Sequence, residues 1–142
     1  QNLPVVVRRD GELVSLNVKL VEGWRRQNDI SWRVSSWGMR RIGTGGLLFE
    51  PLTSEQRRNA GVDPDGLALR VKHVGQYGAH AAAKRAGFKA GDIVTSYDGQ
   101  MSDWTPSQLL GYIGQETITG QKVAVRINRD GQILKLTLPI QK

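Results

Sequence analysis

The residues that could carry acid–base, nucleophilic or metal chemistry are few in this chain, and their spacing does not form a catalytic site. The two histidines, His73 and His80, form neither an HExxH pair nor a metal-binding cluster. A serine hydrolase needs a serine, a histidine and a carboxylate together, and no serine lies in a G-x-S-x-G turn. There is no cysteine, so thiolate metal sites, disulfides and cysteine nucleophiles are excluded. We expect a chain that is not itself an enzyme, holds no metal or cofactor, and keeps both histidines partly exposed.

A glycine-rich segment over Ile42–Pro51 is the next candidate, because glycine-rich loops can bind phosphate through backbone N–H groups. Its sequence, IGTGGLLFEP, predicts a loop that runs into an apolar strand. Neither the phosphate-binding G-x-x-x-x-G-K-[ST] pattern nor a G-x-G-x-x-G pattern is present. The segment therefore gives no evidence of a nucleotide site.

The segment Trp24–Arg41 combines aromatic and basic residues. It contains three of the four tryptophans, and five arginines against one aspartate. Such interleaving occurs in surfaces that bind polyanions or single-stranded nucleic acid. It also fits an extended linker whose tryptophans pack on a neighbouring domain while the arginines stay in water. Because no clean helical or strand period runs through it, we favour the linker and expect no nucleic acid partner.

Length and charge set broad limits. The 142 residues suit one domain with an appendage, and the net charge is +7. Residues 1–44 carry +4 and residues 45–142 carry +3, so the excess is concentrated in the first third. No run of 18 apolar residues occurs, and we expect no membrane span.

A β-hairpin is predicted near each end of the chain. Pro4–Arg9 and Glu12–Leu20 alternate apolar and polar residues around the turn dipeptide Asp10-Gly11, and the pattern returns 120 residues later around Asp130-Gly131. The matched apolar positions are Val5, Val7, Leu13, Val14, Leu16, Val18 and Leu20 in the first copy and Val125, Ile127, Ile133, Leu134, Leu136, Leu138 and Ile140 in the second. An isolated hairpin is marginal in water, so we expect the first copy to pack on the sheet of the domain or on another chain.

Two capping boxes predict where helices begin. Thr53-Ser54-Glu55-Gln56 opens a short helix to about Ala60. Thr105-Pro106-Ser107-Gln108, with proline at the first helical position, opens a second helix that ends at Gly114 or soon after. Leu67–Val74 is the strand expected between them.

Residues 86–100, AGFKAGDIVTSYDGQ, are the most informative stretch. A small alanine-rich helix over His80–Ala86 ends at Gly87, Ile93–Tyr97 forms a strand, and Asp98-Gly99 turns the chain. This order closely resembles the central signature of PDZ domains, particularly those of bacterial HtrA/Deg-type serine proteases. The glycine-rich nucleophile loop of those proteases does not occur in the chain.

The resemblance implies an α+β fold: a PDZ-like small antiparallel β-barrel or sandwich with two helices, here with an N-terminal β-hairpin. In such domains a hydrophobic–Gly–hydrophobic turn binds a peptide's terminal carboxylate. The matching register is Gly45-Gly46-Leu47 or Gly46-Leu47-Leu48, and in both a glycine stands where such domains have the first apolar residue. The implied peptide-binding residues are Gly45, Gly46, Leu47, Leu48, Phe49, Pro106, Leu110, Ile113 and Gly114. A position in the core is the alternative for the helix residues, above all for Ile113.

The resemblance also implies a domain organisation and a function. Residues 1–24 would be a hairpin from the end of a preceding PDZ-like repeat and 42–142 the PDZ-like domain. Residues 25–41, which the resemblance does not cover, would be a basic tryptophan-rich linker. The expected function is that of a peptide-binding module, a regulatory or substrate-recognition part of a larger periplasmic or secreted protein such as an HtrA/Deg-type serine protease. Its partners would be protein C-termini, extended peptides added as a strand, or other domains of the same chain. The alternative is an assembly or anchoring module that uses the basic tryptophan-rich segment while its groove is idle.

Overall fold

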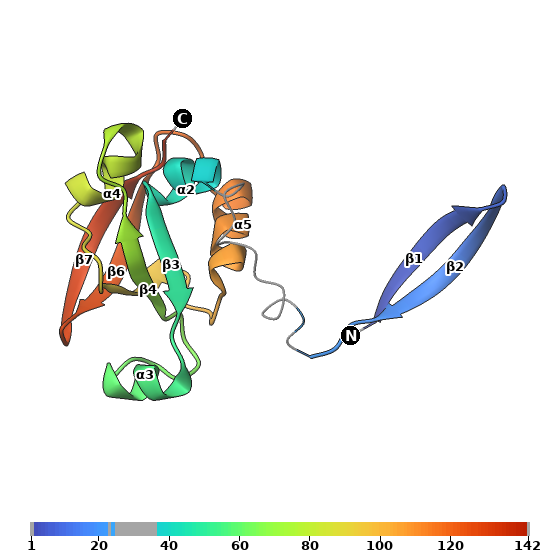
Figure 1. Ribbon diagram of the computed structural model, residues 1–142, viewed down its shortest axis with the longest axis horizontal. Coiled ribbons are helices and arrows are strands. Elements are labelled where there is room, and N and C mark those ends of the chain that lie inside the picture. The colour runs from blue at the N-terminus through green and yellow to red at the C-terminus, as the bar shows by residue number, and fades with distance from the viewer. Residues whose placement is uncertain (1, 23, 25–36, 142) are drawn as a thin grey trace.

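The computed structural model describes residues 2–22, 24 and 37–141, so most of the segment Trp24–Arg41 lies outside the described residues. Strands β1 (Asn2–Arg9) and β2 (Glu12–Lys19) form an antiparallel two-stranded sheet. A five-stranded antiparallel sheet contains, in spatial order, β3 (Leu47–Pro51), β4 (Leu69–Val74), β5 (Ile93–Tyr97), β6 (Lys122–Arg129) and β7 (Gln132–Pro139) (Figure 1). The helices are α2 (Trp37–Thr44), α3 (Ser54–Asn59), the 3₁₀ turn η2 (Gly78–Ala81), α4 (Ala82–Arg85) and α5 (Pro106–Glu116).

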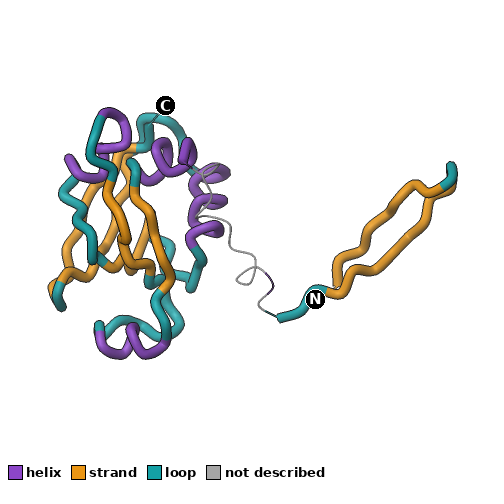
Figure 2. The backbone as a smooth tube through the Cα atoms, viewed as in Figure 1, coloured by secondary structure: helices purple, strands orange, loops and turns teal. Residues whose placement is uncertain are grey.

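The α+β class is confirmed, and the larger sheet is open and does not close into a barrel. The strands of the larger sheet follow chain order, and β3 and β7 are its two outer strands in the described part of the protein. Helices α3 and α5 and the short alanine-rich turn at α4 are as predicted, whereas α2 was not predicted. Figure 2 shows the helices placed beyond the ends of the strands and along one side of the sheet.

The core lies between the sheet and α5. Along β6 the side chains of Val123, Val125 and Ile127 are almost completely buried, in the alternating pattern of a strand with one covered face. Leu109 of α5 is equally buried and belongs to the same apolar cluster. The alternation seen in the sequence therefore fixes which face of β6 meets the helix.

Helix α2 is held against α5 and β5 by close contacts. A Cβ atom at Gly43 would collide with the side chain of Ile113, so only glycine allows the two helices to come this close. The hydroxyl of Tyr97 donates a 2.7 Å hydrogen bond to the carbonyl of Gly43. The loop predicted from Ile42 onward was therefore wrong for residues 42–44, which form the last turn of this helix.

Residues 37–41 of the predicted linker are also part of α2. Trp37 lies edge-on to His80, with ring centroids 6.1 Å apart, and the guanidinium of Arg40 lies 5.4 Å from the Trp37 ring centroid. The packing of a tryptophan is as expected, although Trp37 stays 40% exposed. The expectation that the arginines stay in water is wrong for Arg40, which is 3% exposed.

The sequence repeat is also a structural repeat. Each of the eight residue pairs of β1–β2, from Asn2↔Lys19 to Arg9↔Glu12, has its counterpart 120 residues later in β6–β7. Asp10 and Asp130 have positive φ angles of 52° and 51°, and the glycines that follow match as closely. The surroundings differ, since both strands of the first hairpin are largely exposed. Within the described residues its strands pair only with each other, so the expected packing on the larger sheet is not seen.

Candidate functional site

A small apolar hollow lies between α2 and α5, with a volume of about 200 Å³. Its lining residues come from both helices and from the chain after α5: Met39, Ile42, Gly43, Leu110, Ile113, Gly114, Thr117, Thr119 and Ile140. No charged side chain is among them, so the hollow suits an apolar group.

The predicted site residues on α5 are only partly brought together. Leu110, Ile113 and Gly114 line the hollow, and the side chains of Leu110 and Ile113 are 6% and 5% exposed. Ile113 also belongs to the core cluster, so it both lines the hollow and contributes to the core. Pro106 is buried at the start of the helix and does not line the hollow.

The predicted residues on β3 divide between the core and the surface of the sheet. Leu47 and Phe49 are buried in the core, while Leu48 between them is half-buried. None of the three lines the hollow. β3 pairs with β4 along one edge, and no strand of the described residues pairs with its other edge. That free edge, on the side of α5 in Figure 1, offers main-chain groups to an added strand.

The two glycines of the predicted carboxylate loop lie at a crowded junction. Gly45 and Gly46 have φ angles of 62° and 92°, which favour glycine. A Cβ at Gly46 would collide with the carbonyl of His80. The N–H of Gly46 donates to the carbonyl of Arg40 at 2.9 Å. A peptide carboxylate at this loop would compete with that carbonyl for the Gly46 N–H.

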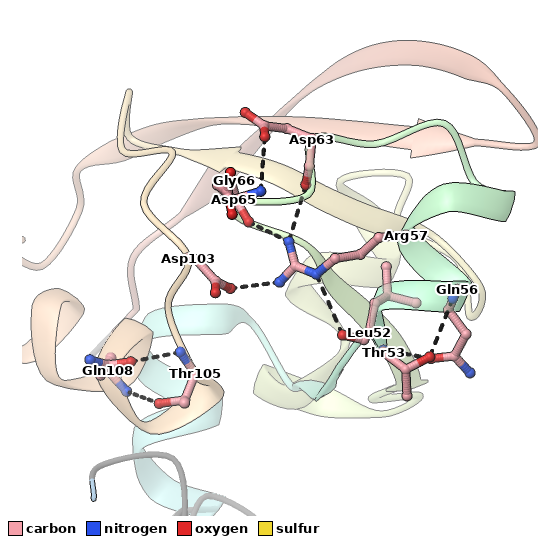
Figure 3. A network of polar contacts seen from close by, with 10 residues as sticks. All are labelled: Leu52, Thr53, Gln56, Arg57, Asp63, Asp65, Gly66, Asp103, Thr105 and Gln108. Atoms are coloured by element: carbon pink, nitrogen blue, oxygen red, sulfur yellow. Dashed lines mark hydrogen bonds and ion pairs between the residues drawn. The ribbon is translucent and has the colours of Figure 1, made fainter. Parts of the chain in front are cut away.

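The start of α5 is fixed by two polar arrangements. Thr105 accepts a hydrogen bond from the Gln108 backbone N–H, and the Gln108 side chain accepts one from the Thr105 N–H, so the predicted capping box is confirmed. Beside it, the buried Arg57 donates to the carbonyl of Gly66 at 2.7 Å and forms a 2.6 Å ion pair with Asp103 (Figure 3). Arg57 thereby ties α3 to the chain that leads into α5. These contacts fix the position of the N-terminal end of α5.

The charge state of Tyr97 matters for the junction between α2 and the sheet. Burial raises the pKa of the Tyr97 hydroxyl far above its ordinary value, and the negative charge of Asp98 adds to the shift. The hydroxyl therefore stays protonated at neutral pH and remains a donor to the Gly43 carbonyl.

The described residues give no metal site and no membrane helix. Across residues 2–22, 24 and 37–141, no three histidine, aspartate or glutamate side chains lie close enough to hold a metal ion. In the same residues, no helix is both long and apolar enough to span a membrane.

Sequence reasoning missed the contribution of α2. Met39, Ile42 and Gly43 form one wall of the hollow, and they lie in the segment assigned to the linker and the glycine-rich loop. Their spacing of i, i+3 and i+4 is the helical signal that could have placed them on one face. The arginines and small residues around them obscured that period.

Comparison with known proteins identifies the class. No family model matches the chain. Its fold is that of PDZ-like domains of HtrA-type proteases: a solved structure of a variant of the protease AlgW with a decapeptide matches 68% of this chain and 28% of that chain, with 25% identity and a TM-score of 0.59. The same variant with a tripeptide matches with a TM-score of 0.53 at the same identity and coverage of this chain.

The particular relatives are curated periplasmic serine endoproteases named DegP. The chain is 25% identical to DegP of Salmonella typhimurium and 26% identical to DegP of Escherichia coli K12, in each case over 150 residues and 96% of this chain. These matches confirm the resemblance to HtrA/Deg-type proteases. The chain spans 30% of the length of these relatives.

Proposed function

We propose that this chain is a peptide-binding module, a regulatory or substrate-recognition part of a longer periplasmic or secreted protein of the HtrA/Deg type. Two matched AlgW structures hold a decapeptide and a tripeptide, and the DegP relatives are periplasmic proteases. The chain itself would bind and not cleave. Unfolded casein should stay intact when it is incubated with the purified chain. Hydrolysis of the casein that a serine-directed inhibitor abolishes would contradict this.

The observation that carries the proposal is the free edge of β3 beside α5, with an apolar hollow at the α2–α5 junction. An extended peptide would add to β3 as a further strand, and its main-chain hydrogen bonds would supply affinity independent of sequence. The hollow would take the last side chain and favour Val, Leu, Ile or Phe. Burial of a side chain of that size is worth roughly 1.5–3 kcal/mol. Micromolar affinity, about −8 kcal/mol, is expected for a short segment that becomes ordered on binding.

The decisive experiment compares one peptide with a free and with an amidated C-terminus. A peptide selected from a library by the 142-residue chain would be titrated in both forms by calorimetry. We expect the free form to bind at least about tenfold more tightly, because the amide removes the negative charge that backbone N–H groups would bind. Equal affinities would mean that the groove binds internal strands and that Gly45-Gly46 does not bind a carboxylate.

The assembly or anchoring alternative rests on the segment Trp24–Arg41, whose residues 25–36 lie outside the described residues. Trp37 and Arg40 of that segment contact each other, and Trp37 contacts His80. Both therefore have contacts within the domain that explain their presence without an external partner.

A further inference from the structure

A second and larger hollow lies away from the proposed groove, between the end of β4 and the connection from α4 to β5. Its volume is about 440 Å³. It exists because β4 pairs with β5 only through Leu69 and Arg70, after which the two chains separate. The backbone of Val71 still bonds to Gly91 and Asp92, and beyond that point the space between the chains opens.

The floor of this hollow is apolar and its rim is basic. Phe88 and Val74, which are 3% and 5% exposed, belong to the core and contribute the floor. Lys72, Lys84 and Lys89 line the rim and are all exposed. No aspartate or glutamate is among the lining residues. The hollow thus combines an apolar surface with three ammonium groups.

The surrounding sequence concentrates this positive charge. Residues 66–91 contain five lysines and arginines and no aspartate or glutamate, whereas the rest of residues 45–142 has a net charge of −2. Of the three rim lysines, Lys72 lies 3.5 Å from Glu50. Lys84 donates to the amide oxygen of Gln76 at 2.7 Å, and this partner is neutral. The basic character is therefore local and is not a consequence of the net charge of the whole chain.

We propose that this hollow binds an acidic segment of a protein partner, with an apolar side chain seated on Phe88 and carboxylates placed on the rim lysines. A nucleic acid or polysaccharide would match the lysines but leave the apolar floor without a partner. A segment that alternates acidic and apolar residues matches both features. The site shares no lining residue with the hollow between α2 and α5, so the two hollows are distinct.

The test uses a peptide that has no free terminus. A fluorescein-labelled peptide of alternating glutamate and phenylalanine or leucine, blocked by an acyl group and a C-terminal amide, would be titrated with the full chain by anisotropy. We expect saturable binding that weakens as salt is added, because exposed charge pairs are screened. Replacement of the glutamates by glutamine, or of the apolar residues by serine, should each reduce affinity at least about tenfold.

Two charge-matched variants locate the site. Lys72→Gln, Lys84→Gln and Lys89→Gln together should weaken binding at least about tenfold. The control replaces three exposed lysines elsewhere, Lys19→Gln, Lys122→Gln and Lys135→Gln, and should change affinity less than about twofold.

Several results would overturn the proposal. Equal losses in the two triple variants would show that only net charge matters. Undiminished binding of the glutamine or serine peptide would show that the carboxylates or the apolar floor are not used. An oligonucleotide of equal charge that binds as tightly, with the same loss in the pocket variant, would reassign the site to polyanions. Because the substituted lysines do not line the hollow between α2 and α5, the two triple variants separate these outcomes from the test of the groove.

Discussion

Leu110 is the residue on which the proposed groove most directly depends. It lines the hollow between α2 and α5 and is 6% exposed, so a carboxylate placed there would lie beside the terminal carboxylate of a bound peptide. We expect Leu110→Glu to weaken binding of the selected peptide at least about tenfold, by loss of apolar surface and by repulsion.

A matched control separates this effect from a general effect of charge. Ile133 is 58% exposed on β7 and does not line the hollow, so Ile133→Glu should leave affinity unchanged. Circular dichroism and thermal unfolding would verify that both variants are folded. A folded Leu110→Glu variant with unchanged affinity would place the peptide elsewhere.

Tyr97 gives a prediction for stability against pH. Removal of its hydroxyl in Tyr97→Phe leaves the Gly43 carbonyl without this donor, which should cost about 1–3 kcal/mol near neutral pH. Since burial raises the pKa of Tyr97, the unfolded chain loses this proton at lower pH than the folded chain. The contribution is therefore fully present below about pH 10 and is lost above it at about 1.4 kcal/mol per pH unit.

The measurement is urea unfolding at several alkaline pH values. The stability difference between the wild-type chain and Tyr97→Phe should shrink as pH rises above about 10. Tyr77→Phe is the control, because Tyr77 is 86% exposed and its loss should not alter stability. A difference that stays constant with pH would mean that the Tyr97 hydroxyl ionises as readily in the folded chain as in the unfolded one.

Among the elements, those set by local chemistry were predictable from the sequence. Both capping boxes gave helix starts that the structure confirms, at Thr53 and Thr105. The β6–β7 hairpin was given by alternation and its Asp-Gly turn. The same local signals gave Leu110, Ile113 and Gly114 their places on one helix.

Elements fixed by long-range packing gave only weak local signals. α2 is held by Ile113 and Tyr97, which lie far along the chain, and its own sequence buries an arginine and exposes Met39. Nothing in Gly45-Gly46 indicated that the Gly46 N–H would donate to Arg40 and not remain available to a ligand. The α2 wall of the hollow between α2 and α5 was missed because distant residues hold α2 in place.

The first hairpin is an element whose partner can be tested. We propose that β1–β2 are the last two strands of another PDZ-like sheet, because their register and turn match β6–β7 while their apolar side chains are exposed. Leu3 and Val18 are 49% and 44% exposed, whereas their counterparts Val123 and Leu138 are fully buried. In the chain alone, the β1–β2 amides should therefore exchange much faster than those of β6–β7.

Hydrogen exchange read by mass spectrometry checks this within one molecule, with β6–β7 as the internal standard. The exchange of β1–β2 should slow in a longer fragment of the parent protein that carries a preceding repeat. Protection equal to that of β6–β7 in the chain alone, at every protein concentration, would mean that the hairpin is stable without such a partner.

On the scale of the whole molecule, the positive charge falls into two regions with different expected roles. Residues 66–91 carry a local charge of +5 and include all the residues that line the larger hollow, whereas Trp24–Arg41 carries a local charge of +4. The net charge alone could not distinguish them, since it contains no spatial information. Only the structure shows that Phe88 and Val74 give the first region an apolar floor.

The role of the second region is tested by removal of its charge. One variant combines four substitutions: Arg25→Gln, Arg26→Gln, Arg33→Gln and Arg41→Gln. We expect it to elute from immobilised heparin at a lower salt concentration than the wild-type chain, with a decrease no larger than the loss of four positive charges explains. Arg40 is left in place because it is buried against Trp37, and its loss would disturb α2. A control with four arginines changed elsewhere, Arg8→Gln, Arg9→Gln, Arg58→Gln and Arg126→Gln, should elute at the same position. A much larger loss in the first variant, with a steep dependence on salt, would show a specific polyanion surface and favour the anchoring function over a linker.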